Sequence, residues 1–288
     1  MPIHDFSYRH WEGERSERPP ALVLGSAQIR VALQRRAVKL LLLVSGLFVI
    51  AYLGILYVET MPRDGLLGFL RNIPLVKLDG RTLQIFLDRQ RLLHYLICLA
   101  AGAEVIALDR RFRTLQIYLA RPLRVPDYLV GKALPLLLLL SLCTWVPALL
   151  LLVLKSATTA SFEWLRQEPH LPFAIVAYST LLILCLTSIT LAVSSLTSSP
   201  RLASGQLVAV LLFPSAAGDI LAALTHDDAW QLLSLNANLD QVCSWFFRRE
   251  LPYELSPWAT LAMLLALTAA GIAILLRRVR AVDVVGGS

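Results

Sequence analysis

The sequence predicts an all-α integral membrane protein with six transmembrane helices. Of its 288 residues, 57% are hydrophobic and only 16% are charged, and the mean hydropathy is +0.64. A soluble domain carries about 25% charged residues, so the composition favours a polytopic membrane protein. Helices are expected because a helix pairs its own backbone groups, whereas an open sheet edge in lipid would leave those groups unpaired.

Six apolar segments are long enough to cross a bilayer, because a hydrocarbon core of about 30 Å needs roughly 20 residues of helix. The expected spans are Leu40–Val58, Leu92–Leu108, Ala133–Leu154, Phe173–Leu196, Leu207–Leu224 and Trp258–Leu276. The second span is the shortest and contains His94 and Glu104. The fifth contains Pro214 and Asp219, so we expect it to bend or break.

The distribution of Lys and Arg predicts the orientation of these spans, since cytoplasmic loops carry an excess of positive charge. With the N-terminus inside, four regions would be cytoplasmic and would hold 17 of the 27 Lys and Arg residues. These regions are 1–39, 109–132, 197–206 and 277–288. Both termini are therefore predicted to be cytoplasmic, with a six-span domain at 40–276 between the N-terminal segment and the C-terminal tail.

The two long external connections, 59–91 and 225–257, carry amphipathic or aromatic stretches. Both are too short to form independent domains. We expect them to lie as short helices at the outer membrane interface, where amphipathic segments bury an apolar face and keep a polar face in water.

The connection between spans two and three has the most informative pattern in the chain. Residues 108–132 contain five arginines and one lysine. Phe112, Leu115 and Leu119 recur at helical spacing and would share one face of a short amphipathic helix, while Gln116 would lie on another face. Two prolines would end that helix. Taken alone, the pattern fits equally well a basic anchor on anionic lipid headgroups.

The order of residues in this connection resembles permease subunits of the ABC-2 type of ATP-binding-cassette transporter. In that family, an acidic-basic pair at the end of a span precedes a short helix closed by proline, and Tyr-Leu-x-Gly-Lys then opens the next span. The matching residues here are Asp109-Arg110-Arg111, Thr114-Leu115, Arg121-Pro122-Leu123 and Tyr128-Leu129-Val130-Gly131-Lys132. Many members place Gly before the Thr, where this chain has Arg113, and this difference affects the detail of docking.

The resemblance implies a fold and a site. The family has six spans, cytoplasmic termini, an Arg-rich tail and an N-terminal amphipathic elbow helix, which here would be Ala21–Val38. Its short helix between spans two and three is a coupling helix that docks into a groove of the ATPase subunit. The residues to which the resemblance assigns ATPase coupling are Asp109, Arg110, Arg111, Phe112, Arg113, Thr114, Leu115, Gln116 and Leu119.

The implied function is that of the permease subunit of an ATP-driven exporter, in the inner membrane of a bacterium. The expected partners are a separate cytoplasmic ABC ATPase, a second permease half in a homodimer or heterodimer, and membrane lipids. Nucleic acid is not an expected partner, because the basic residues sit at the ends of apolar segments. ATP and Mg²⁺ would bind the partner ATPase, and this chain would carry no cofactor of its own.

No enzymatic activity is predicted for the chain itself. The phosphate-binding motif G-x-x-x-x-G-K-[ST] is absent, since Gly131-Lys132 is followed by Ala133. The run LASGQ at 202–206 resembles the ABC signature LSGGQ, but it is expected in a tight turn between two spans and no phosphate loop accompanies it. The five histidines are scattered without ligand spacing, so no metal site is predicted.

Glu104 is an acidic residue within the second predicted span, where carboxylates are costly and usually paired or functional. It lies about one turn from Asp109, so we predict a structural ion pair with Arg35, Arg36 or Arg110 that orients the elbow helix against span two. If Glu104 instead relayed ions, the chain would be an ion-coupled secondary transporter. A polytopic membrane enzyme or a scaffold without transport activity would also be compatible with six apolar spans.

Overall fold

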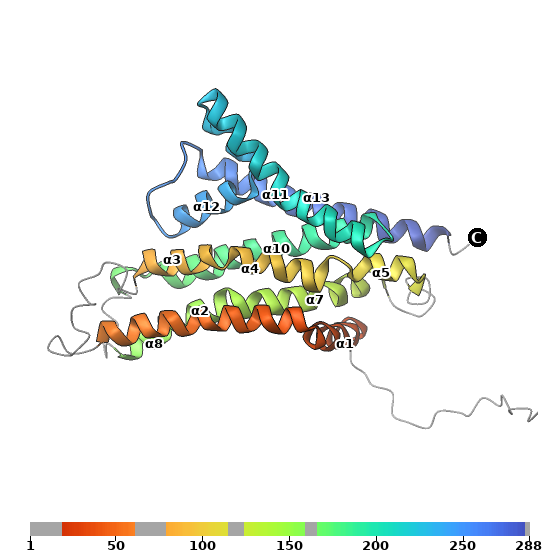
Figure 1. Ribbon diagram of the computed structural model, residues 1–288, viewed down its shortest axis with the longest axis horizontal. Coiled ribbons are helices and arrows are strands. Elements are labelled where there is room, and N and C mark those ends of the chain that lie inside the picture. The colour runs from red at the N-terminus through yellow and green to blue at the C-terminus, as the bar shows by residue number, and fades with distance from the viewer. Residues whose placement is uncertain (1–18, 61–78, 115–123, 159–165, 286–288) are drawn as a thin grey trace, which may run out of the picture.

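The computed structural model describes residues 19–60, 79–114, 124–158 and 166–285, with side chains in the last helix as far as Val279. Its helices form an elongated bundle (Figure 1). Within the described residues the chain forms helices and no strand, which confirms the all-α fold. The elements in chain order are α1 (Pro20–Gln34), α2 (Arg36–Thr60), α3 (Gly80–Arg89), α4 (Arg91–Ile97), the π-helix η3 (Cys98–Gly102), α5 (Val105–Arg111), α7 (Val125–Cys143), α8 (Trp145–Thr158), α10 (Leu171–Leu196), α11 (Pro200–Thr225), the 3-10 helix η4 (Asp228–Leu233), α12 (Leu235–Phe246) and α13 (Pro257–Val285).

The prediction of six spans is confirmed by length and composition. The helical segments able to cross a membrane are Arg36–Thr60, Gly80–Arg111, Val125–Thr158, Leu171–Leu196, Pro200–Thr225 and Pro257–Val279. Span two combines α3, α4, η3 and α5, and span three combines α7 and α8. Figure 1 places α1, the end of α5, the start of α11 and the end of α13 at the same end of the bundle, as the predicted topology requires.

Helix α10 lies at the centre of the bundle. Buried residues make up 72% of its most apolar stretch, compared with 11% for α2, and α10 packs against α5, α7, α8, α11, α12 and α13. Its close approach to α13 requires Gly271, because a Cβ there would lie 3.0 Å from the backbone carbonyl carbon of Ser188. Helices in lipid commonly approach one another through such small residues.

The helical segment of span two begins with α3, twelve residues before the predicted start at Leu92; the interfacial position expected for this part of the chain stays a prediction. Asp79 caps α3 by accepting a hydrogen bond from the Thr82 N–H at 2.8 Å, a common N-cap arrangement. One face of α3 is apolar and buried, and it includes Leu83, Phe86 and Leu87. The other face is polar, which lowers the mean hydropathy and conceals the start of the span in the sequence.

In the second external connection the chain forms the short helix α12, which packs against the bundle; its place at the outer interface stays a prediction. Ser234 caps α12, and its Oγ accepts a hydrogen bond from the Ala237 N–H at 3.1 Å. The helix packs against α10, α11 and α13. Its fully buried side chains include Leu239, Val242 and Cys243.

Polar contacts hold α12 against span two. The Arg91 guanidinium donates to the carboxylate of Asp88 at 2.8 Å and to that of Asp240 on α12. The Tyr95 hydroxyl donates to Asn236 Oδ1 at 2.6 Å. Buried charged groups are costly unless paired, so these contacts favour a fixed position for α12 against span two.

Helix α11 runs without interruption from Pro200 to Thr225, with Pro214 inside it, so the predicted break does not occur. The residues of the LASGQ run, 202–206, lie in the first turns of this helix rather than in a tight turn. His226 ends the helix in a left-handed conformation with a φ of 53°. Figure 1 shows α11 slanting away from the other spans toward the end opposite α5.

Candidate functional site

The predicted coupling segment starts at the end of α5, where three consecutive side chains, Arg111, Phe112 and Arg113, are exposed. Phe112 is 64% exposed, and the Arg111 guanidinium carbon lies 5.7 Å from the centre of its ring. Arg113 has a φ of 55°, which is uncommon for residues other than glycine. The chain therefore turns sharply here, and Phe112 belongs to this turn rather than to a helix running from Phe112 to Leu119.

The turn is tied back to α5 by Thr114. Its hydroxyl lies 3.2 Å from Asp109 Oδ1 and 3.3 Å from the Asp109 backbone oxygen. The remaining residues of the predicted coupling helix, Leu115, Gln116 and Leu119, lie outside the described residues, and their assignment stays a prediction.

Asp109 and Lys132 join the two ends of this connection in a buried polar network. Asp109 Oδ2 lies 2.7 Å from Lys132 Nζ and accepts a hydrogen bond from the Tyr128 hydroxyl at 2.6 Å. The side chains of Lys132 and Asp109 are only 1% and 12% exposed. Removing one member of a buried ion pair strongly destabilises a protein, because the remaining charge stays buried without a partner. The last turn of α5 and the first turns of α7 are therefore held as one unit.

Helix α1 packs on the same part of α7 through two glycines. A Cβ on Gly131 would lie 2.8 Å from Leu24 of α1, and a Cβ on Gly25 would lie 2.8 Å from Leu134 of α7. Each glycine thus receives a leucine from the facing helix, which lets the two backbones approach closely. Helix α1 ends at Gln34, four residues before the predicted end of the elbow helix, and the chain bends at its C-cap before α2 begins.

Span two is interrupted by the π-helical turn η3, and Arg35 uses a carbonyl group of that turn. The Arg35 Nη1 donates to the Ala100 carbonyl at 2.6 Å. The turn lies close to its neighbours, since a Cβ on Gly102 would lie 2.5 Å from Thr190 and 2.8 Å from Leu136. Single π-helical turns inside spans are frequent at functional sites. Here the turn connects the α1–α2 junction to span two.

Glu104 follows this turn, and its Oε2 lies 3.7 Å from Arg35 Nη1. Of the three arginines predicted as partners, Arg35 is the one that pairs with Glu104, while Arg110 donates to the backbone oxygen of Ser195. Both side chains of the pair are about one third exposed, 32% for Arg35 and 35% for Glu104. Exposed pairs contribute roughly 0–1 kcal/mol, so the contribution of this pair to stability is small.

The end of α10 supports the restart of α5. Ser194 Oγ accepts hydrogen bonds from the N–H groups of Ile106 and Ala107, at 3.0 and 3.2 Å. These amides belong to the first turn of α5, where helix N–H groups lack intrahelical partners. Together with the Arg110–Ser195 contact, they fix α5 to the central helix.

The structure thus separates the predicted coupling residues into two groups. Asp109, Arg110 and Thr114 bond within the chain, while Arg111, Phe112 and Arg113 are exposed. Sequence reasoning missed Ser194, Ser195 and the two glycines of the α1–α7 contact. Two adjacent serines at the end of an apolar run could have indicated the hydrogen bonds of Ser194 and Ser195. The glycine contacts could not be predicted in this way, because they depend on which helices pack together.

The family model described as ABC-2 family transporter protein matches residues 34–284. The match covers the six spans and the connection that contains the Asp109–Lys132 network. No curated protein matches the chain. Because the family model spans most of the sequence, the chain is a multi-pass membrane protein that belongs to the ABC-2 transporter family.

Proposed function

We propose that the chain is the membrane-spanning permease subunit of an ATP-driven ABC exporter. A separate cytoplasmic ATPase would bind ATP and Mg²⁺, and a second permease half, identical or different, would complete the pathway. Both termini would lie in the cytoplasm, and the membrane would be the inner membrane of a bacterium. In this arrangement the chain contributes no catalytic residue of its own.

One observation carries the proposal: Asp109, Tyr128 and Lys132 bond across the base of the connection between spans two and three. A force applied to the connection would reach both spans together, because its two ends share a buried ion pair. A lipid anchor has no need for such a junction. The family match covers the same connection and supports a role in coupling.

The contacts around this base suggest how movement would spread. Helix α1 packs on α7 through Gly25 and Gly131, and α5 is bonded to α10 through Ser194 and Ser195. Closure of the ATPase subunits on ATP would displace the connection. The displacement would then move α1, α5, α7 and the inner end of α10 as one body.

The exposed residues at the turn are suited to docking. Phe112 would enter an apolar groove of the ATPase together with Leu115 and Leu119, and burial of a phenylalanine side chain contributes about 1.5–3 kcal/mol. Arg111 and Arg113 would provide polar contacts around it. Asp109, in contrast, would not contact the ATPase but would hold the docking segment in place through Thr114 and Lys132.

Co-purification tests the proposal. The tagged chain, expressed with its native partners and extracted in mild detergent, is expected to retain Mg²⁺-dependent ATP hydrolysis that the chain purified alone lacks. Recovery of the chain without any ATPase subunit, from membranes in which it is fully folded and inserted, would contradict the proposed function.

A further inference from the structure

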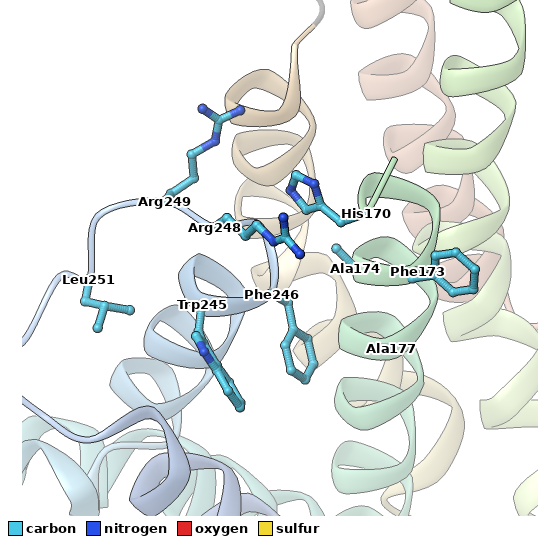
Figure 2. Close-up of a pocket in the computed structure, with 9 residues that line it drawn as sticks. All are labelled: His170, Phe173, Ala174, Ala177, Trp245, Phe246, Arg248, Arg249 and Leu251. Carbon is cyan, nitrogen blue, oxygen red and sulfur yellow. The ribbon is translucent and has the colours of Figure 1, made fainter. Parts of the chain in front are cut away.

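A groove lies at the end of the bundle opposite α5, between the start of α10 and the end of α12. Its volume is about 500 Å³, within the range of small-molecule sites. Figure 2 shows its two walls. The walls include His170, Ala174 and Ala177 from α10 and Trp245, Phe246 and Arg248 from α12 and the loop after it.

The position of this groove at the start of α10 is compatible with a mouth at headgroup depth. The 26 residues of α10 correspond to about 39 Å of helix, which exceeds the hydrocarbon thickness of about 30 Å. The excess length lies beyond the hydrocarbon at one or both ends, and the groove lies at the end that begins after the N-cap residue His170. Trp245 and Trp258 meet nearby with ring centroids 4.7 Å apart, as expected for tryptophans at a membrane interface.

The lining of the groove carries positive charge. Arg248 is exposed, and its guanidinium makes no hydrogen bond or ion pair with the part of the chain that the structure describes. Figure 2 shows this side chain extending toward His170 and α10. The neighbouring Arg249 differs, because it pairs with Glu168 at 2.9 Å. Among the described residues, no acidic side chain lines the groove itself, while Asp88 and Glu250 line the adjoining pocket that shares Arg248 and Arg249. The charge within the groove therefore favours an anion.

Apart from its charged mouth, the lining of the groove is mostly apolar. His170, Ala174 and Ala177 follow one another at the i, i+4 and i+7 positions of α10 and so lie on one face. The two alanines leave space along the helix, and Phe246 extends from α12 toward this space (Figure 2). A hydrocarbon chain suits this apolar lining better than a compact polar ion does.

We propose that this groove binds an anionic phospholipid of the surrounding bilayer. The phosphate lies against Arg248 beside His170, and one acyl chain runs along Ala174 and Ala177 opposite Phe246. Arginine suits this role because its guanidinium donates charge-assisted hydrogen bonds to phosphate oxygens. The inference does not depend on coupling to an ATPase and holds for either orientation of the chain.

Native mass spectrometry of the detergent-purified full chain tests the proposal. Phosphatidylglycerol and phosphatidylcholine with the same acyl chains are titrated, and we expect phosphatidylglycerol to bind about tenfold more tightly, a difference of about 1.4 kcal/mol. Arg248→Gln should remove this preference. Arg201→Gln, a matched change at an exposed arginine of α11, should preserve it.

A second arm tests the apolar part of the groove. Ala177→Phe fills this part at an exposed position and should weaken the binding of both lipids, whereas Ala273→Phe at an exposed position of α13 should not. Inorganic phosphate at millimolar concentration should fail to displace phosphatidylglycerol.

Three results would overturn the inference. Equal affinity of the wild type for the two lipids would show that the lipid charge is not recognised. An unchanged preference of Arg248→Gln for phosphatidylglycerol would show that this arginine does not bind the lipid. Displacement of phosphatidylglycerol by inorganic phosphate would assign the groove to a free anion instead of a lipid.

Discussion

Asp109 and Lys132 form a buried ion pair, 2.7 Å between Oδ2 and Nζ, at the two ends of the connection between spans two and three. The pair lies next to the exposed residues Arg111–Arg113. It therefore connects a surface suited to docking with two spans of the membrane domain. Its stability should be measurable independently of any partner.

The first prediction concerns this pair. Asp109→Asn leaves the buried Lys132 ammonium without its carboxylate partner and should lower the free energy of unfolding by about 3–5 kcal/mol. The double variant Asp109→Leu/Lys132→Met should recover much of that loss, because it removes both charges. Thermal unfolding in detergent of the wild type, the double variant and its two single variants provides the measurement. If the loss of stability in the double variant equals the sum of the losses in the two single variants, the two residues do not interact.

The second prediction concerns the contact between α1 and α7. Gly131→Ala places a methyl group 2.8 Å from Leu24, so either the leucine or the helix must shift, at a cost of about 1–3 kcal/mol. Gly46→Ala is the matched control, because no atom of the described chain lies within 4 Å of a Cβ at that position of α2. Unfolding midpoints of the two variants should differ clearly. Equal midpoints would indicate that α1 does not pack tightly on α7.

Sequence patterns predicted the six spans because each contains a long apolar run, and long runs remain visible whatever packs against them. They placed the start of the second helical segment too late, because in α3 the apolar Leu83, Phe86 and Leu87 alternate with polar residues that lower the mean hydropathy. They did not predict how α12 packs. The contacts that bury its apolar face come from α10, α11 and α13, and the position of these helices around it is not encoded locally.

The candidate site was predictable only in part. The family resemblance indicated that the residues around Asp109 and Lys132 matter, and the charge of Glu104 predicted an arginine partner. The π-helical turn at Gly102 and the acceptor role of Ser194 were not. Both depend on the approach of α10 to span two, which a local pattern does not encode.

The third prediction tests whether Glu104 is structural. Its pair with Arg35 is long and partly exposed, so Glu104→Gln should lower the free energy of unfolding by less than about 1 kcal/mol. The pH profile of transport by the reconstituted complex should be unchanged. A shifted profile would favour an ion-coupled transporter, in which Glu104 exchanges a proton during transport.

The fourth prediction concerns topology. Single cysteines at Arg113 and Arg278 should react with a membrane-impermeant maleimide only from the cytoplasmic side, and cysteines at Arg81 and Glu250 only from outside. All four native positions are exposed, so labelling should be efficient.

The native cysteines should contribute little background in this assay, because Cys98, Cys143, Cys185 and Cys243 are all buried. Burial also raises the pKa of Cys243 well above its ordinary value, which keeps this residue in the unreactive thiol form. Labelling of Arg113→Cys from outside would make contact with a cytoplasmic ATPase impossible.

The most direct test of the account measures the ATPase recovered with variants of the coupling segment. Leu115→Asp should reduce the ATPase that co-purifies with the tagged chain by at least about tenfold, because a buried charge in an apolar groove costs several kcal/mol unless it is paired. Gln116→Ala, on another face of the predicted helix, should retain nearly all of it, and both variants should still insert and fold. Recovery of equal ATPase by Leu115→Asp and the wild type would contradict the account and would leave this segment as a lipid anchor.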